Sequence, residues 1–193
     1  MPAGRHCAAC LDAEIGVTSR GQQCEHAVVP DYRLRAATAA DARFLADVVS
    51  EATRAQGRVP PDFDEREWRE EFGKQTMEQI RGEVPGSTTS VIETGNERVG
   101  RLRVTRTAGY IQLSGIQLLP RVQRRGVGTA IIEELKAQAA ATGLPLDLEV
   151  EKDNPDALRL YERLGFLRVG QTAQEYKLRW AQPADAALPP TAP

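Results

Sequence analysis

The most informative segment of the chain reads Ile116-Gln117-Leu118-Leu119-Pro120-Arg121-Val122-Gln123-Arg124-Arg125-Gly126-Val127-Gly128-Thr129. Its pattern predicts an apolar strand, a stop at Pro120, and a basic turn that opens a helix. The N-terminus of a helix carries unpaired N–H groups and a partial positive charge, so it attracts anions. Gly126 and Gly128 would let a phosphate approach the backbone closely, and the neighbouring arginines add positive charge. The segment therefore predicts a pyrophosphate site on the amides of residues 123–129.

Two common nucleotide motifs do not fit this segment. A P-loop needs Gly-Lys-Ser/Thr after four spacer residues, and that pattern is absent. A dinucleotide fingerprint needs a third glycine where this chain has Ile131. A general phosphate- or nucleotide-binding protein therefore remains only as a less favoured alternative.

Working outward from this segment, strand and helix patterns alternate along the chain. Strands are expected at 32–36, 88–93, 98–105, 110–119, 146–150, 166–169 and 175–180, and helices at 38–54, 64–81, 126–141 and 154–164. Gly95-Asn96 is a plausible hairpin turn between two of the strands. Hairpins followed by helical crossovers predict an α/β (α+β) domain with a mixed sheet and helices on both faces.

The two ends of the chain differ from its middle. Residues 1–29 lack periodicity and are interpreted as an appendage, and residues 181–193 are Ala/Pro-rich and expected to be a disordered tail. Cys7, Cys10, Cys24 and His26 could supply four zinc ligands, which makes a small Cys/His knuckle an alternative to a disordered start. No metal site is expected in the main domain of residues 30–180.

Composition narrows the possible chemistry. All three cysteines and both histidines lie in the first 26 residues, so Ser-His-Asp, Cys-His and His-ligated metal catalysis cannot be built from the main domain alone. The net charge of −2 argues against a general nucleic-acid binder. No apolar run approaches membrane-spanning length, and no secretion pattern is found, so a cytoplasmic protein without membrane contact is the default expectation.

A second block of sequence turns the pyrophosphate prediction into a family resemblance. It reads Leu148-Glu149-Val150-Glu151-Lys152-Asp153-Asn154-Pro155-Asp156-Ala157-Leu158-Arg159-Leu160-Tyr161-Glu162-Arg163-Leu164-Gly165-Phe166. Together, the Gln123–Gly128 turn and this block resemble the two ordered signatures of the GNAT superfamily of acyl-CoA-dependent N-acetyltransferases. The resemblance covers about residues 31–180.

The resemblance implies a fold and a co-substrate. The fold would be a mostly antiparallel sheet of six to seven strands whose central strands splay apart, and the co-substrate would be acetyl-CoA. Its pantetheine arm would pair with the backbone of Ile116, Gln117 and Leu118 like an added strand. The cofactor-binding residues implied by the motifs are Gln123, Arg124, Arg125, Gly126, Val127, Gly128 and Thr129 for the pyrophosphate, and Asn154 near the splay.

The resemblance also implies catalytic roles. Tyr161, two helical turns after Asn154, is the candidate acid for the leaving thiolate, with a core tyrosine as the structural alternative. Glu149 is the candidate base, because ribosomal-protein N-terminal acetyltransferases use a Glu on this strand; Glu151 and water remain open as alternatives. Gln117 occupies a position that holds a catalytic Glu in some relatives, and an amide cannot act as a base.

The expected function is therefore transfer of an acetyl group from acetyl-CoA to a primary amine, and we expect a small molecule as the acceptor. A protein N-terminus and a non-catalytic acyl-CoA-binding module are the alternatives. The acceptor site in this superfamily is shaped by the first two helices, where Trp68 and Phe72 fit either a core stripe or a substrate wall. A monomer or homodimer is expected.

Overall fold

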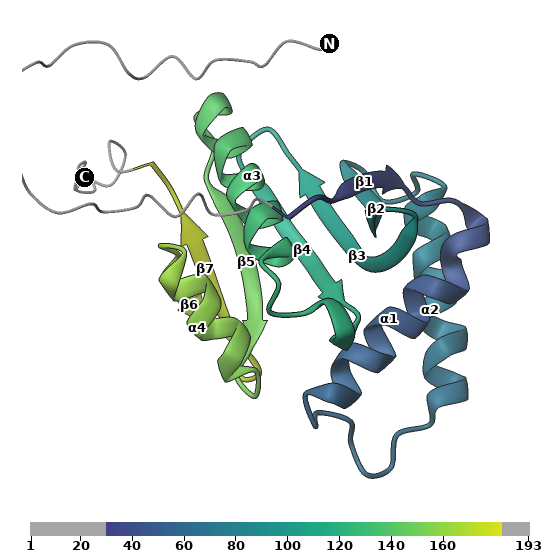
Figure 1. Cartoon of the computed structure of the whole chain (residues 1–193). Helices are drawn as coiled ribbons and strands as arrows, with labels where there is room; N and C mark the ends of the chain where they lie inside the picture. Colours follow the sequence, from purple (N-terminus) through teal and green to yellow (C-terminus); the bar gives the residue numbers. More distant parts are fainter. Residues whose placement is uncertain (1–29, 183–193) are drawn as a thin grey trace, which may run out of the picture.

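The computed structural model describes residues 30–182 as a single α/β domain (Figure 1). Its strands are β1 (Arg33–Ala36), β2 (Ser87–Thr94), β3 (Glu97–Arg106), β4 (Ile111–Leu118), β5 (Leu146–Glu151), β6 (Leu167–Gln171) and β7 (Glu175–Trp180). Its helices are α1 (Ala42–Ala55), α2 (Glu65–Ile80), α3 (Val127–Thr142) and α4 (Pro155–Arg163), with 3-10 turns η1 (Ala39–Asp41) and η2 (Pro120–Val122). This order of elements is the one predicted from the sequence.

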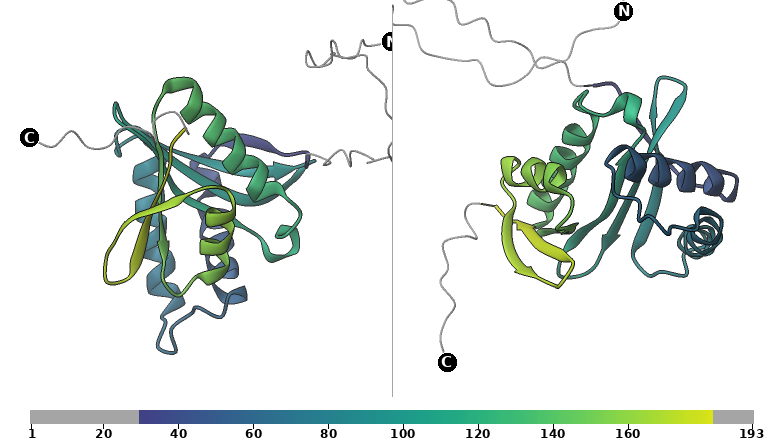
Figure 2. Two further views of the ribbon diagram at one scale, coloured as in Figure 1. Left: turned by 90° about the vertical axis from the view of Figure 1, so that its left-hand side faces the viewer. Right: turned by 90° about the horizontal axis from the view of Figure 1, so that it is seen from below.

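All strands of the described domain join one seven-stranded sheet in the order β1-β2-β3-β4-β5-β7-β6. Every neighbouring pair is antiparallel except β4 and β5, which run parallel. Helices α1 and α2 cover one face of the sheet, and α3 and α4 cover the other (Figure 2, right). The predicted mixed, mostly antiparallel sheet with helices on both faces is confirmed.

The hydrophobic core lies mainly between the sheet and α3. Ile131, Ile132 and Leu135 of α3 are almost completely buried, as are Leu146 and Leu148 of β5. Burying each such side chain contributes roughly 1.5–3 kcal/mol to folding. This packing fixes the position of the first turn of α3 relative to the ends of β4 and β5.

Strands β4 and β5 pair over only part of their length. The ladder contains Ile111↔Leu146, Gln112↔Asp147 and Leu113↔Leu148, and then ends. At the next residue, Ser114, the register between β3 and β4 shifts, because Arg103 pairs with Gly115 and Val104 with Leu113. An extra residue of this kind bends a strand and increases its twist. Beyond Leu113, β4 therefore follows β3 and leaves β5, which confirms the predicted splay (Figure 1).

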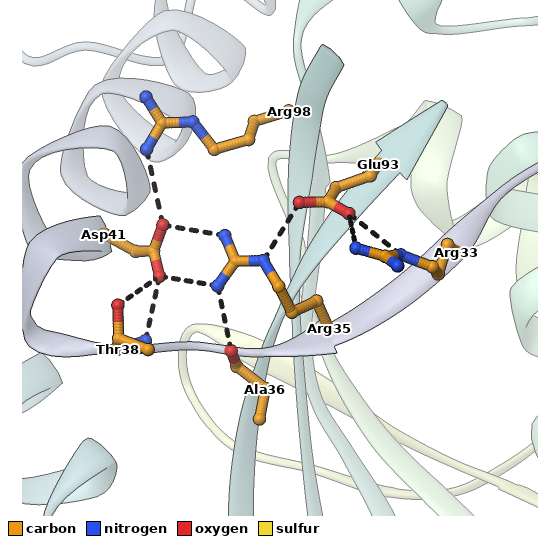
Figure 3. A network of polar contacts seen from close by, with 7 residues as sticks. All are labelled: Arg33, Arg35, Ala36, Thr38, Asp41, Glu93 and Arg98. Atoms are coloured by element: carbon orange, nitrogen blue, oxygen red, sulfur yellow. Dashed lines mark hydrogen bonds and ion pairs between the residues drawn. The ribbon is translucent and has the colours of Figure 1, made fainter. Parts of the chain in front are cut away.

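A buried carboxylate ties the start of α1 to the sheet (Figure 3). Asp41 is 3% exposed and accepts two hydrogen bonds of 2.9 Å from Arg35 of β1. It also accepts from the backbone N–H and the hydroxyl of Thr38, and from Arg98 of β3 at 3.3 Å. Glu93 of β2 accepts from the other edge of Arg35 at 3.0 Å. The network therefore holds α1, which forms a wall of the site described below, against three strands.

Some sequence-based predictions fall outside the described residues. These are the appendage of residues 1–29 with its candidate zinc ligands Cys7, Cys10, Cys24 and His26, and all but two residues of the predicted tail. Between residues 30 and 182, no helix combines the length and apolar character needed to cross a membrane.

We expect Asp41→Asn to lower the free energy of unfolding by about 2–3 kcal/mol at pH 7, because it removes one of the two carboxylates that bind the partly buried guanidinium of Arg35. Hydrogen bonds from Arg35 hold the pKa of Asp41 well below its ordinary value. The folded state therefore binds this proton less readily than the unfolded chain does. The stabilisation is complete above about pH 4 and is lost as the pH falls below that value.

Urea unfolding of the wild type and the variant between pH 3 and pH 7 measures this difference, which should shrink toward the acid end. Asp62→Asn, at an exposed loop position, is the matched control and should change stability by less than about 0.5 kcal/mol. An Asp41→Asn cost that is absent, or equally large at pH 3 and pH 7, would contradict this account of the network.

Candidate functional site

A pocket of about 890 Å³ opens where β4 and β5 separate. One wall is α1 and the loop that follows it, and the opposite wall is β5 and α4. The first turn of α3 closes one end. Of the site residues predicted from the sequence, all but Arg125 and Val127 line this pocket: Ile116, Gln117, Leu118, Gln123, Arg124, Gly126, Gly128, Thr129, Glu149, Asn154 and Tyr161. The structure thus brings together residues that are up to 45 positions apart in the sequence.

The turn before α3 has the backbone geometry of an anion site. Gly126 has φ of 84°, and Arg124, with φ of 60°, is the single non-glycine residue of positive φ in the described domain. Strained backbone of this kind concentrates at ligand sites. Within the described domain no side chain caps the first turn of α3, and that turn contains no acidic residue. The amide N–H groups of this turn are therefore free of a competing side chain and fit a phosphate group.

The side chains of the turn have different roles. Arg124 is 91% exposed and has only a 3.9 Å contact to Asp156, while Arg125 is exposed and forms no ion pair within the described domain. Val127 is buried in the core, so only its backbone can face a ligand. Gln123 donates from Nε2 to the carbonyl of Leu118 at 2.8 Å. The side chain of Gln123 therefore holds the turn against the end of β4. The guanidinium groups of Arg124 and Arg125 and the backbone amides of the turn are the groups that can contact a ligand.

The far half of β4 presents backbone groups to the pocket. Residues 115–118 pair with β3 on one side, while the ladder to β5 has already ended at Leu113. The backbone groups of Ile116, Gln117 and Leu118 that face β5 consequently have no strand partner within residues 30–182. An extended ligand can add to such an edge in the manner of a further strand.

Helix α4 brings Asn154 and Tyr161 to the same pocket. Asn154 is the N-cap of α4, and its Oδ1 accepts from the N–H of Ala157 at 3.2 Å. Capping uses the acceptor of the Asn154 amide, so Nδ2 is the group that can donate to a ligand. The seven-residue spacing predicted to place both residues on one side of the helix does so.

Tyr161 combines a core ring with a hydroxyl at the pocket. The residue is 9% exposed, and its ring packs edge-on against Phe166 with centroids 5.7 Å apart. Its hydroxyl forms no hydrogen bond with any side chain or backbone group of residues 30–182, although the residue lines the pocket. Burial raises the pKa of Tyr161 to about 12. The phenol therefore keeps its proton at neutral pH and is present in the pocket as a hydrogen-bond donor.

Glu149 and Glu151 both point away from the core face of β5, but their partners differ. Glu149 contacts Lys177 at 3.5 Å, whereas Glu151 is bound by the guanidinium of Arg58. Arg58 also contacts Asp153 at 2.8 Å. This triple contact joins the α1–α2 loop to the opposite wall and occupies Glu151. The carboxylate of Glu149 has the longer and single contact with a cation, so it is more accessible to a ligand than the carboxylate of Glu151.

Aromatic side chains cover the α1–α2 side of the pocket. Trp68 stacks on Phe72 with centroids 4.9 Å apart, and Phe63 lies 5.9 Å from Trp68. Phe63 and Trp68 line the pocket and Phe72 lies behind them. Neither residue belongs to the buried core, so the core stripe is not found; Trp68 lines the pocket, and a substrate wall stays a prediction.

Two features of the site were not predicted from the sequence. One is the irregular register at Ser114, for which the adjacent Gly115, a glycine inside a strand pattern, was an available signal. The other is Arg101 of β3, a 5% exposed arginine whose Nη1 donates to Gln117 Oε1 at 3.1 Å. A signal for Arg101 also exists, since an arginine at a central position of a strand flanked by Gly100 and Leu102 is unusual.

Comparison with other proteins agrees with this geometry. Residues 50–166 match the family model described as the acetyltransferase (GNAT) family. Mycothiol acetyltransferase from Saccharopolyspora erythraea is 30% identical over 128 residues, which are 59% of this chain and 42% of that protein. The chain therefore spans about two fifths of the length of this curated relative.

Solved structures share the fold. The PaiA N-acetyltransferase from Thermoplasma acidophilum, in complex with coenzyme A, superposes with a TM-score of 0.67 and 15% identity, covering 78% of this chain and 99% of that one. An acetyltransferase from Thermus thermophilus gives a TM-score of 0.63 and 21% identity, with 79% of this chain and 98% of that one covered.

The Gly128→Ala variant tests whether this position needs a glycine for ligand binding or for the stability of the fold. A Cβ at this position would meet only Leu118 Cδ1, at 3.7 Å, so the variant should fold and its helix should gain about 0.5–1 kcal/mol. If a pyrophosphate lies against the first turn of α3, the same Cβ should weaken coenzyme A binding about tenfold or more in calorimetric titration.

Gly73→Ala is the control, because Gly73 lies within α2 with no atom near its absent Cβ. It should raise the melting temperature without changing the dissociation constant of coenzyme A. A Gly128→Ala variant that binds coenzyme A as tightly as the wild type would remove the assigned position of the pyrophosphate.

Proposed function

The chain belongs to the acetyltransferase (GNAT) family, and from that premise we propose that it transfers the acetyl group of acetyl-CoA to a primary amine. Members of this family are acetyl-CoA-dependent N-acetyltransferases. One observation carries the proposal for this chain: the free edge of β4, the uncapped N-terminus of α3 and the hydroxyl of Tyr161 all open into one pocket. These three features suit, in turn, an extended thioester arm, a pyrophosphate and a leaving thiolate.

The proposed cradle uses residues of four elements. Amides of residues 124–129 and the side chains of Arg124 and Arg125 would hold the pyrophosphate. The β5-facing edge of Ile116–Leu118 would hold the arm, and Nδ2 of Asn154 would donate to it. Backbone N–H groups near Leu118 would lie beside the thioester carbonyl and stabilise the negative charge that develops on its oxygen.

The proposed reaction balances as follows. The ammonium of the acceptor loses one proton to Glu149, directly or through water, and the free amine attacks the thioester carbonyl carbon. The C–N bond forms, the nitrogen loses its second proton to water, and the C–S bond breaks. The departing thiolate takes a proton from Tyr161, which is restored from solvent. The net products are an N-acetyl amide, coenzyme A and one proton.

A small-molecule acceptor is favoured over a protein N-terminus. Arg58 reaches from the α1–α2 loop to Glu151 and Asp153 on the opposite wall and so crosses the pocket. This contact narrows the approach to the reacting centre. A screen of amines and short peptides with acetyl-CoA, followed by thiol release and product mass, tests both the transfer and the acceptor class; binding of acetyl-CoA without turnover of any amine would contradict the proposal.

Tyr161→Phe should lower kcat about 100-fold with little change in acetyl-CoA affinity, because it removes only the proposed proton donor. The matched control is Tyr110→Phe, which deletes the hydroxyl of a tyrosine that is 37% exposed on the β3–β4 turn and should leave kcat unchanged. Undiminished turnover by Tyr161→Phe would show that the thiolate is protonated by another group.

Glu149→Gln should lower kcat/KM roughly 100-fold at pH 7, since it removes the proposed base. The deficit should shrink toward about pH 10, where more of the acceptor is already the neutral amine. Glu151→Gln is the comparison, because Arg58 already occupies that carboxylate. Normal activity of Glu149→Gln together with a large loss of activity in Glu151→Gln would show that Glu151, and not Glu149, is the base.

A further inference from the structure

The guanidinium of Arg101 is buried without an acidic partner. Arg101 is 5% exposed, and no carboxylate of the described domain pairs with it. Its Nε is buried and makes no hydrogen bond, and its guanidinium carbon lies 5.2 Å from the ring centroid of Phe72. Burial and the charge of Arg103 lower the pKa of Arg101 to about 10, so it remains a cation at neutral pH. Buried charges are normally paired, but this positive charge has no counterion among residues 30–182.

Gln117 connects this cation to the pocket. Arg101 and Gln117 lie directly opposite each other on β3 and β4, and Nη1 of Arg101 donates to Oε1 of Gln117 at 3.1 Å. A guanidinium can only donate, so the Gln117 amide must present its oxygen to Arg101. Nε2 of Gln117, a donor polarised by the adjacent charge, is then the group that remains for a ligand. Gln117 itself lines the pocket.

The opposite wall of the pocket carries the reverse charge. Glu149 lines the pocket from β5 on the far side of the splay. The two walls therefore offer a carboxylate on one side and a donor backed by a cation on the other. A ligand with an ammonium and an anionic group would satisfy both.

We propose that the acceptor is an amine that also bears a carboxylate, as in an amino acid. Its ammonium would lie at Glu149, and its carboxylate would accept from Nε2 of Gln117 with the positive charge of Arg101 behind it. Phe63 and Trp68 in the same pocket would pack against an apolar or aromatic side chain of the acceptor. This inference rests on the proposed function and names the substrate class of the same site.

Matched pairs of acceptors test the requirement for a carboxylate. With saturating acetyl-CoA, kcat/KM is compared for phenylalanine and phenethylamine, tyrosine and tyramine, and lysine and cadaverine, with spermidine as a polycation. The acid of each pair should be preferred by about tenfold or more, as expected for one charge-assisted hydrogen bond. Equal rates within pairs, or preference for spermidine, would overturn the inference.

Gln117→Glu tests the same point from the side of the protein. It places a carboxylate against Arg101, neutralises the cation and repels an anionic acceptor. We expect the ratio of kcat/KM for phenylalanine to kcat/KM for phenethylamine to fall about tenfold or more. Gln117→Leu, which removes the donor without adding charge, should lower the same ratio to a smaller extent. Parallel losses on both acceptors in Gln117→Glu would contradict the assigned contact.

Controls distinguish a failure of the proposed function from a failure of this inference about the acceptor. Thermal unfolding verifies that each variant is folded, and calorimetry with coenzyme A measures whether the cofactor site of each variant is intact. If no amine is acetylated although acetyl-CoA binds, the proposed function fails, and this inference fails with it. If amines are acetylated without regard to their carboxylates, only the inference fails.

Discussion

The site depends on the early end of the pairing between β4 and β5. Three residue pairs join the two strands, and the irregularity at Ser114 then turns β4 away. Had the ladder continued, the backbone groups of residues 115–118 would be satisfied by β5, and the pocket would be filled by sheet. Unpaired strand edges normally invite association with another extended chain. Here α1, α4 and the first turn of α3 surround the open edge, so it is accessible to a narrow ligand and protected from another sheet.

Successive side chains of a strand point to opposite faces of the sheet, so one set packs in the core and the other lines the pocket. Leu148 and Val150 face the core, and Glu149 between them faces the pocket. The same constraint places Arg101 opposite Gln117 on the α1–α2 side of the sheet. Tyr161 belongs to both environments, because Phe166 fixes its ring while its hydroxyl remains free. Core packing thus fixes the positions of the reactive side chains and leaves their polar atoms available to a ligand.

The fold could be predicted from the sequence because its signals are local. Apolar spacing located α1 and α3, and Gly95-Asn96 marked the hairpin between β2 and β3. Element ends were predicted less accurately: Phe166, expected to begin a strand, is instead a buried core residue before β6. The two motifs supplied eleven predicted site residues that line the pocket, but they did not reveal the residues that contact them. Contacts such as Arg58 with Glu151, or Arg101 with Gln117, join residues far apart in sequence. They depend on the register between strands and on the path of the loop between α1 and α2.

The most direct test of the account is hydrogen–deuterium exchange of β4 with and without coenzyme A. In the free protein, amides of residues 114–118 that face β5 should exchange rapidly, while those bonded to β3 should be protected. Adding coenzyme A should protect the rapidly exchanging amides together with those of the first turn of α3. Protection confined to α3, or no change in β4, would contradict the claim that the separated strand edge holds the ligand.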